Sequence, residues 1–338
     1  MKKIVFILIV ISVATKLTAQ DLHFSQYFNS PMLLNPANTG MLQDANWRAG
    51  INYRNQATTI PVPYNTFSIF SDFTLFQNKW DNAWIGTGFA AWRDVAGNGD
   101  LALTKIQGNL AAHVLTGDYT NFSAGLGFAY NQRSVDFSKL TYDVQWDEFT
   151  FNKNVSNQEN FTIQKTTFTD LNAGVNFSYY NNDNIFFKVS IAASHLTQPV
   201  ETFYGQSNKI GIRPIANAEL VYKANDNIIL SPSVYYTRQK KASELVGGTT
   251  LGINASGNTL SNLGNEIVIG FFYRNKDAVI GMAGYKWKRN QFLFSYDHTV
   301  SQLGVANKGL GAMEVSLIIQ GNYRSNEERT RVYGCPRF

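Results

Sequence analysis

Hydrophobic and polar residues alternate one by one along most of the chain after residue 45. In residues 122–130 every second residue is apolar and its neighbours are small or polar, and residues 291–297 and 313–320 repeat the pattern. A period of two is that of a β-strand, whose successive side chains point to opposite faces. The pattern predicts an all-β protein. It does not distinguish a membrane barrel from a water-soluble sandwich, which shows the same alternation with its faces inverted.

The connections between the predicted strands favour a barrel. Fourteen candidate strands lie near residues 45–54, 66–76, 82–93, 101–115, 119–132, 168–181, 184–195, 209–223, 226–239, 243–253, 265–274, 277–287, 290–300 and 309–321. Most connections after even-numbered strands are short, whereas several after odd-numbered strands are long, and residues 133–167 form the longest. This asymmetry is typical of outer-membrane β-barrels. Residues 254–264 and 275–276 break the rule, and a boundary error there would change the strand count by two.

Composition supports the membrane interpretation. Aromatic residues make up 14% of the chain, Gly occurs 26 times and only 16% of residues are charged, whereas a soluble domain carries about 25% charged residues. No apolar run after the N-terminus is long enough for a transmembrane helix. We therefore predict an antiparallel transmembrane outer-membrane β-barrel of about 14 strands over residues 45–321. Aromatic pairs such as Tyr235-Tyr236 and Phe272-Tyr273 suit interfacial girdles or ordinary sheet packing.

The N-terminus predicts export. Lys2 and Lys3 precede an apolar run over residues 4–13, and Ala19 ends a short polar region, so residues 1–19 form a signal peptide. Its removal takes away Lys2, Lys3 and Lys16, which lowers the formal charge from +5 to +2. No nucleic-acid partner is predicted from so small a charge. An even strand number places both chain ends at the short-turn rim, which is periplasmic in an outer-membrane barrel.

Residues 20–44 form an irregular N-terminal segment before the first strand. Pro31 and Pro36 remove backbone donors and disfavour a continuous helix, while Asn38 and Gly40 favour turns. A barrel of about 14 strands is too wide to be filled by its own wall side chains. We therefore expect this N-terminal segment, residues 133–167, or both, to fold into the lumen as a plug.

The sequence offers no catalytic or cofactor site. There is one Cys and the four His are scattered, so neither a disulfide nor a zinc cluster is predicted. Asp297 and His298 are neighbours in a predicted strand and point to opposite faces, which makes a poor acid–base pair. Asp143, Asp147 and Glu148 lie in the longest connection, where solvated carboxylates are a better interpretation than a calcium site. The protein is predicted not to be an enzyme, with no cofactor and no metal.

The last residues, 322–338, form a charged periplasmic tail without strand alternation. A disordered end is one interpretation. Docking to a partner is the other, because the tail ends in Tyr333, Cys335, Pro336, Arg337 and Phe338 and so carries some apolar surface.

Several short motifs follow one another along the chain. They are His23-Phe24-Ser25-Gln26-Tyr27, Pro31, Leu34-Asn35-Pro36-Ala37, Thr39-Gly40, Tyr53-Arg54-Asn55-Gln56, Ser138-Lys139-Leu140, residues 193–199 and the closing Cys335-Pro336-Arg337-Phe338. This set resembles the PorP/SprF family of outer-membrane proteins of the type IX secretion and gliding-motility apparatus of Bacteroidetes. Ala57 departs from the family pattern, which has an aromatic residue there.

The resemblance implies a non-enzymatic barrel of the bacterial outer membrane that acts in protein secretion. One kind of member is the partner or anchor of a large secreted gliding adhesin with a C-terminal secretion domain. Another kind is a core component that contacts periplasmic ring and motor proteins, and an outer-membrane solute channel is a further alternative. The residues carried over as partner-binding or plug positions are His23, Phe24, Ser25, Gln26, Tyr27, Phe28, Pro31, Asn35, Pro36, Asn38 and Gly40, with the closing residues as a docking site.

Overall fold

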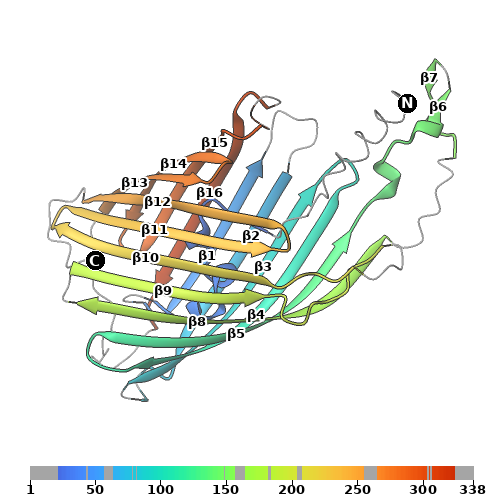
Figure 1. The fold of residues 1–338 in the computed structure, drawn as a ribbon. Coiled ribbons are helices and arrows are strands. Elements are labelled where there is room, and N and C mark those ends of the chain that lie inside the picture. The colour runs from blue at the N-terminus through green and yellow to red at the C-terminus, as the bar shows by residue number, and fades with distance from the viewer. Residues whose placement is uncertain are drawn as a thin grey trace, which may run out of the picture.

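The computed structural model describes residues 22–42, 45–56, 64–77, 79–80, 82–147, 149–156, 164–181, 184–203, 208–254, 265–302, 304 and 307–323. Among these, fourteen strands close into one barrel, in which each strand pairs with the barrel strands before and after it and the first pairs with the last (Figure 1). The strands are β1 (Trp47–Gln56), β2 (Tyr64–Leu75), β3 (Ala83–Ala96), β4 (Leu101–Leu115), β5 (Thr120–Ser134), β8 (Lys165–Asn181), β9 (Ile185–Ser194), β10 (Arg213–Asn225), β11 (Ile228–Gln239), β12 (Ala242–Asn254), β13 (Asn265–Arg274), β14 (Ala278–Trp287), β15 (Asn290–Thr299) and β16 (Leu310–Gly321).

The barrel closes between its first and last strands. β1 and β16 pair antiparallel from Trp47 opposite Gly321 to Gln56 opposite Ala312. All the other ladders of the barrel are antiparallel too, for example β5 with β8 and β13 with β14. The predicted fold class and strand number are confirmed, and closure gives every barrel strand a paired neighbour on both sides.

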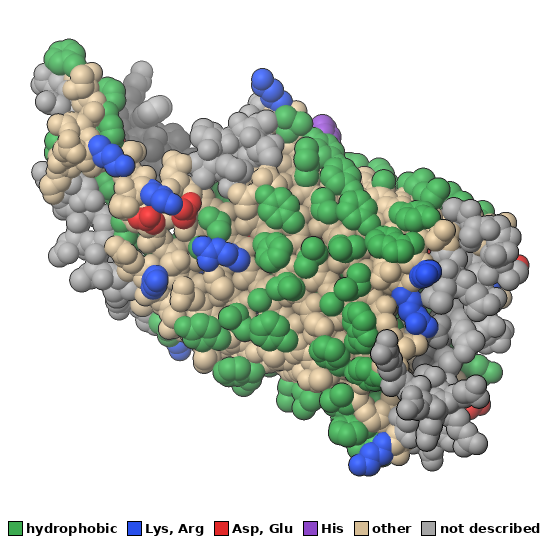
Figure 2. All heavy atoms as spheres, turned by 180° about the vertical axis from the view of Figure 1, so that it is seen from behind, with side chains coloured by type: hydrophobic (Ala, Val, Ile, Leu, Met, Phe, Trp, Pro, Cys, Tyr) green, Lys and Arg blue, Asp and Glu red, His purple; other side chains and the backbone are tan. Residues whose placement is uncertain are grey.

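The alternation along each strand separates an apolar outer face from a polar inner face. In β1, Ile51 and Tyr53 are exposed on the outside, whereas Asn52 and Arg54 are buried inside. The outer surface is a belt of hydrophobic side chains, and most of the Lys and Arg side chains in this view lie toward its ends (Figure 2). This polarity is the reverse of that of a soluble sandwich, and it suits a barrel surrounded by lipid.

The two candidate plugs lie in different places. The N-terminal segment forms the short helical turns η1 (Tyr27–Asn29), α2 (Pro31–Leu34) and η2 (Pro36–Asn38), which are enclosed by the strands (Figure 1). Pro31 and Pro36 each occupy a first helical position, where the missing N–H costs nothing. None of the described helices has the length and hydrophobicity needed to cross a membrane.

Of the two predicted candidates for the plug, the N-terminal segment fills the lumen, whereas the described part of the longest connection lies outside it. This connection carries the turns η3 (Phe137–Lys139) and η4 (Asp143–Gln145) and the strand pair β6 (Trp146–Asp147) and β7 (Thr150–Phe151). These elements extend beyond one rim of the barrel (Figure 1). We call described residues 135–156 the projection and the rim that bears it the long-connection rim; the opposite rim is the short-turn rim.

Candidate functional site

The N-terminal segment runs through the lumen from one rim toward the other. At one end the Leu22 carbonyl accepts a hydrogen bond from Arg213 Nη1 at 3.2 Å, and Arg213 begins β10 at the long-connection rim. At the other end the Gly40 carbonyl accepts from Trp84 Nε1 at 3.0 Å, and Trp84 lies near the start of β3 at the short-turn rim. The first described residue, Leu22, and the end of β16 therefore lie at opposite rims; the chain ends themselves, which the sequence predicted at the short-turn rim, lie outside the described residues.

A charged cluster of Ser25, Arg54, Arg274, Asp297 and Glu314 holds the segment at one side of the lumen. The Ser25 hydroxyl donates to Asp297 Oδ2 at 2.6 Å and accepts from Arg54 Nη1 at 2.5 Å and Arg274 Nη2 at 2.7 Å. The Glu314 carboxylate accepts the backbone N–H groups of Ser25 at 2.8 Å and Gln26 at 3.1 Å. One serine of the segment is thus surrounded by four charged side chains from four strands.

The same four side chains also neutralise one another. Arg54 lies 3.1 Å from Asp297 and 3.2 Å from Glu314, and Arg274 lies 3.1 Å from Asp297. All four are almost fully removed from solvent. Removing one member of such a buried set leaves an uncompensated charge and costs about 3–5 kcal/mol.

Side-chain amides extend this network along the segment. Gln26 Nε2 donates to Ser295 Oγ at 3.0 Å, and Gln26 Oε1 accepts from Asn29 Nδ2 at 3.1 Å and Ser316 Oγ at 2.6 Å. Asn52 Nδ2 donates to the Asn29 carbonyl at 3.1 Å. These contacts satisfy polar groups that the lumen removes from water.

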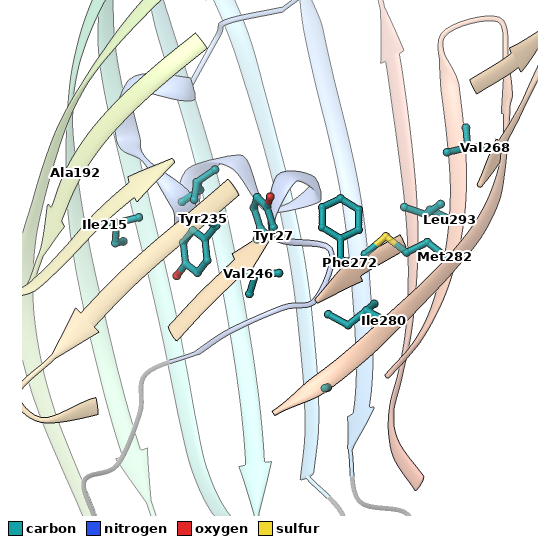
Figure 3. Close-up of a cluster of buried hydrophobic side chains, with 12 residues drawn as sticks. Tyr27, Ala192, Ile215, Tyr235, Val246, Val268, Phe272, Ile280, Met282 and Leu293 are labelled. Carbon is teal, nitrogen blue, oxygen red and sulfur yellow. The ribbon is translucent and has the colours of Figure 1, made fainter. Parts of the chain in front are cut away.

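Aromatic packing anchors the segment on the adjoining part of the wall, on β11 and β13. Tyr27 stacks on Tyr235 with ring centroids 5.0 Å apart and meets Phe272 edge-on at 6.3 Å (Figure 3). The Tyr27 hydroxyl forms a 2.6 Å hydrogen bond with Ser233 Oγ, and burial raises the Tyr27 pKa. Tyr235 and Phe272 face inward while Tyr236 and Tyr273 are exposed outside. Only one residue of each pair can therefore contribute to a girdle, because neighbours in a strand point to opposite faces.

Glycines in the wall make room for the segment. A Cβ at Gly86 would lie 1.9 Å from the Thr39 carbonyl oxygen, one at Gly125 would lie 2.4 Å from the Ala37 nitrogen, and one at Gly174 would lie 2.1 Å from Asn35 Oδ1. Atoms cannot approach so closely, so any larger residue at these positions must displace the segment or the strand. The wall is shaped to the backbone of this particular segment.

Further polar contacts fix the end of the segment near the short-turn rim. Asn35 Nδ2 donates to Asn176 Oδ1 at 2.8 Å, and Asn176 Nδ2 donates to Asn38 Oδ1 at 3.0 Å. The Thr39 carbonyl lies 2.9 Å from His113 Nε2. The Gly40 N–H donates to Asp72 Oδ2 at 2.8 Å, and Gly40 has φ +69°, which suits glycine.

His23 lies near the long-connection rim among charged groups. Burial lowers its pKa to about 4; Glu244 opposes this shift, and Arg54, Arg274 and Arg213 add to it. The imidazole is therefore uncharged at neutral pH.

The predicted site residues of the N-terminal segment all lie in the lumen. His23 and Phe28 are partly buried, and the others are buried: Phe24, Ser25, Gln26, Tyr27, Pro31, Asn35, Pro36, Asn38 and Gly40. Tyr333, Cys335, Pro336, Arg337 and Phe338 lie outside the described residues. Asp297 is buried and His298 exposed, which confirms their opposite orientation. Within the described residues, no group of His, Cys, Asp or Glu has the arrangement of a metal site.

Sequence reasoning missed the wall side of the site. Arg54 belongs to a recognised motif but had no assigned role, and Arg274, Asp297 and Glu314 were not linked to the segment. The available signal was the presence of Arg, Asp and Glu at positions that the alternation of the strands places on the inner face.

The motif of residues 193–199 stabilises the barrel wall and does not hold the N-terminal segment through these contacts. The Asp170 carboxylate of β8 accepts from the His195 N–H at 3.1 Å and the Thr197 hydroxyl at 3.1 Å, and it lies 2.8 Å from His195 Nδ1. β8 pairs with β9 only from Ala173 onward, so these contacts cover the part of β8 beyond that ladder.

The sequence model of the type IX secretion system membrane protein PorP/SprF matches residues 17–319. The chain belongs to this family. The match covers the N-terminal segment and all fourteen barrel strands except the last residues of β16. PorP/SprF proteins are membrane components of type IX secretion, so the lumen described above is that of a secretion-system barrel. No curated protein sequence matches the chain.

Solved structures of similar fold are outer-membrane barrels. The Pseudomonas putida toluene transporter TodX superposes with a TM-score of 0.52 at 8% identity, over 88% of this chain and 95% of that one. The Ralstonia pickettii toluene transporter TbuX gives a TM-score of 0.51 at 10% identity, over 86% and 92%. Identities this low show a shared fold only.

Proposed function

We propose that this PorP/SprF protein is a non-enzymatic barrel of the bacterial outer membrane that serves as partner and anchor for a large secreted gliding adhesin, held through the adhesin's C-terminal secretion domain. Membership of the family supports a role in type IX secretion. An apolar belt around a closed barrel supports an outer-membrane location. In that location the long-connection rim faces the cell surface and the short-turn rim faces the periplasm.

The observation that favours an anchor over a solute channel is the filled lumen. The barrel's own N-terminal segment occupies it from Arg213 near one rim to Trp84 near the other, with contacts to opposite walls. Glycines at Gly86, Gly125 and Gly174 fit the wall to that segment. A wall that fits a filling segment closely does not serve a permanently open diffusion channel. A rigid anchor, in contrast, gains stability from a filled interior.

The two rims give an anchor two places to act. The projection offers a surface outside the cell, and the closing residues 333–338 supply a periplasmic docking peptide in this proposal. Tyr323, the last described residue, fixes where that peptide starts: its hydroxyl donates to the Thr74 carbonyl at 3.0 Å and its N–H to Asn46 Oδ1 at 3.1 Å. Periplasmic ring and motor proteins are the alternative partners at this rim.

Affinity purification from detergent-solubilised outer membranes tests the proposal. An anchor brings down a large secreted protein carrying a C-terminal secretion domain, whereas a core component brings down periplasmic ring proteins instead. Recovery of the barrel alone, together with large permanently open pores in planar bilayers, would support the channel and contradict the anchor.

The tail is tested by truncation after Asn322. We expect the shortened protein to remain folded and inserted, because residues 323–338 follow the last strand, and to display less adhesin on the cell surface. Antibody labelling of the adhesin on intact cells measures display, and heat-modifiable gel mobility confirms folding. Unchanged display would remove the tail's docking role.

A further inference from the structure

The projection exposes apolar side chains beyond the barrel. Phe149 is 85% exposed and Trp146 is 59% exposed, and Val144, Phe151 and Val155 are exposed beside them in the chain. In the space-filling view, hydrophobic side chains gather at the outer end of the projection, away from the belt of the barrel (Figure 2). We call residues 144–147 and 149–155 the tip. Exposed apolar residues that gather in one place generally mark an interaction surface.

The base of the projection is fixed to the barrel. The Asp136 N–H donates to the Gly99 carbonyl at 2.7 Å, and the Val135 N–H donates to the Gln164 carbonyl at 3.0 Å. Lys139 forms an ion pair with Asp100 in the connection between β3 and β4. These contacts hold the projection at a defined position on the rim.

The tip has its own internal frame around Gln145. This buried side chain accepts from the Tyr142 N–H at 3.1 Å and donates to the Val155 carbonyl at 3.1 Å. Next to it, the Asn152 N–H donates to the Gln145 carbonyl at 2.8 Å, and Trp146 pairs with Phe151 across the two short strands. Trp146 and Phe151 are thus presented on a hydrogen-bonded pair of short strands, and such preorganisation lowers the entropy lost on binding.

Charge distinguishes a protein partner from a lipid surface. The sequence of residues 143–155 contains three acidic residues and one basic residue, a net charge of −2. A stretch with net negative charge is repelled by anionic headgroups, whereas it complements a protein surface that carries Lys or Arg.

We propose that the tip is the docking site for a secreted protein at the cell surface. The contact surface of that secreted protein is an apolar pocket bordered by Lys and Arg. This proposal rests on the proposed function, which makes the adhesin's C-terminal domain the occupant. The exposed aromatic residues enter the pocket as anchors, and the net negative charge of the stretch steers the encounter.

Photo-crosslinking in living cells tests the site directly. A photoreactive phenylalanine analogue replaces Phe149 in the full chain, and a second strain carries it in place of Leu126, which is 66% exposed on the apolar belt. We expect position 149 to yield a crosslink identified by mass spectrometry as a protein with a C-terminal secretion domain, and position 126 to yield none. Crosslinks from position 149 to lipid alone would overturn the proposal.

Binding of that purified C-terminal domain to detergent-purified barrels gives the quantitative test. For Trp146→Ser and Phe149→Ser we expect Kd to rise about tenfold or more, as for central aromatic anchors. Phe76→Ser is the matched control, because Phe76 is 50% exposed at the opposite rim. If wild type binds and the tip variants bind equally well, this proposal fails; if wild type does not bind the domain at all, the proposed function itself fails.

Discussion

The N-terminal segment and the projection are both irregular stretches attached to the same barrel, yet one fills the lumen and the other extends outside. The segment contacts luminal side chains of several strands and packs closely against glycines of the wall. Ser25 and Tyr27 make its two main sets of contacts. The projection instead contacts the barrel at one rim, through a hydrogen bond to Gly99 and an ion pair with Asp100. The location of an irregular stretch is therefore decided by what the wall offers it rather than by its own hydrophobicity.

The difference also separates two kinds of aromatic residue. Tyr27 is buried against Tyr235 and Phe272, and its hydroxyl has a partner. Phe149 is mostly exposed. In the first case burial stabilises the fold; in the second the apolar surface remains available for association.

The largest effect is expected from filling the glycine positions of the wall. Gly125→Leu should force the N-terminal segment out of the lumen, since even a Cβ there lies 2.4 Å from Ala37. We expect outer membranes carrying this variant to admit vancomycin, which intact outer membranes exclude. Gly108→Leu is the control, because a Cβ at Gly108 has no neighbour within 4 Å. Equal vancomycin resistance of the two strains, at equal barrel levels, would show that the segment does not need this space.

Breaking the charged cluster should be the next largest effect. Arg274→Met leaves Asp297 with one guanidinium partner instead of two, and the expected loss is about 3–5 kcal/mol in the free energy of unfolding. Urea unfolding in lipid vesicles, followed by tryptophan fluorescence, measures it. Lys139→Met breaks an exposed ion pair of the projection and should leave the transition where it is. A loss of similar size in both variants would contradict the distinction between lumen and projection.

Loosening the aromatic anchor should cost somewhat less. Tyr27→Ala removes the stacking on Tyr235 and leaves Ser233 without its partner, which should lower the free energy of unfolding by about 3 kcal/mol. Combining it with Phe28→Ala should also raise antibiotic permeability and reduce recovery of the partner. If permeability and recovery both stay normal, the segment is neither a plug nor a docking element.

The smallest expected effect concerns pH. The pKa of His23 is lowered to about 4 in the folded protein, against an ordinary value of 6.5. As pH falls from 6.5 to 4, the unfolded state takes up a proton that the folded state resists, so stability decreases across this interval and changes little above it. His23→Gln should lose that part of the pH dependence. Parallel unfolding curves of wild type and variant between pH 4 and pH 7 would contradict the assigned pKa.

Much of the barrel could be predicted from the sequence because period and turn length are local properties. The edges of the fourteen predicted strands lie within a few residues of those observed, and even the short connection after Arg274 was placed at the long-connection rim. Asp297 and His298 were assigned to opposite faces for the same reason.

The contents of the lumen were less predictable because they depend on contacts between residues far apart in the chain. Ser25 forms a hydrogen bond with Asp297, and Asn35 forms one with Asn176. No local sequence pattern predicts either pair. The sequence suggested that something fills the barrel, but the choice between the N-terminal segment and residues 133–167 required the positions of Gly86, Gly125 and Gly174 around the wall. The direction of the segment likewise depends on Arg213 and Trp84.

Single-channel recording in planar bilayers tests the central claim most directly, that the protein's own N-terminal segment closes the barrel. The full mature protein and a variant lacking residues 22–40 are compared at equal insertion. The account predicts a silent full-length protein and stable open-channel steps for the deletion. Large open steps from the full-length protein, or the same silence from a folded and inserted deletion variant, would contradict it.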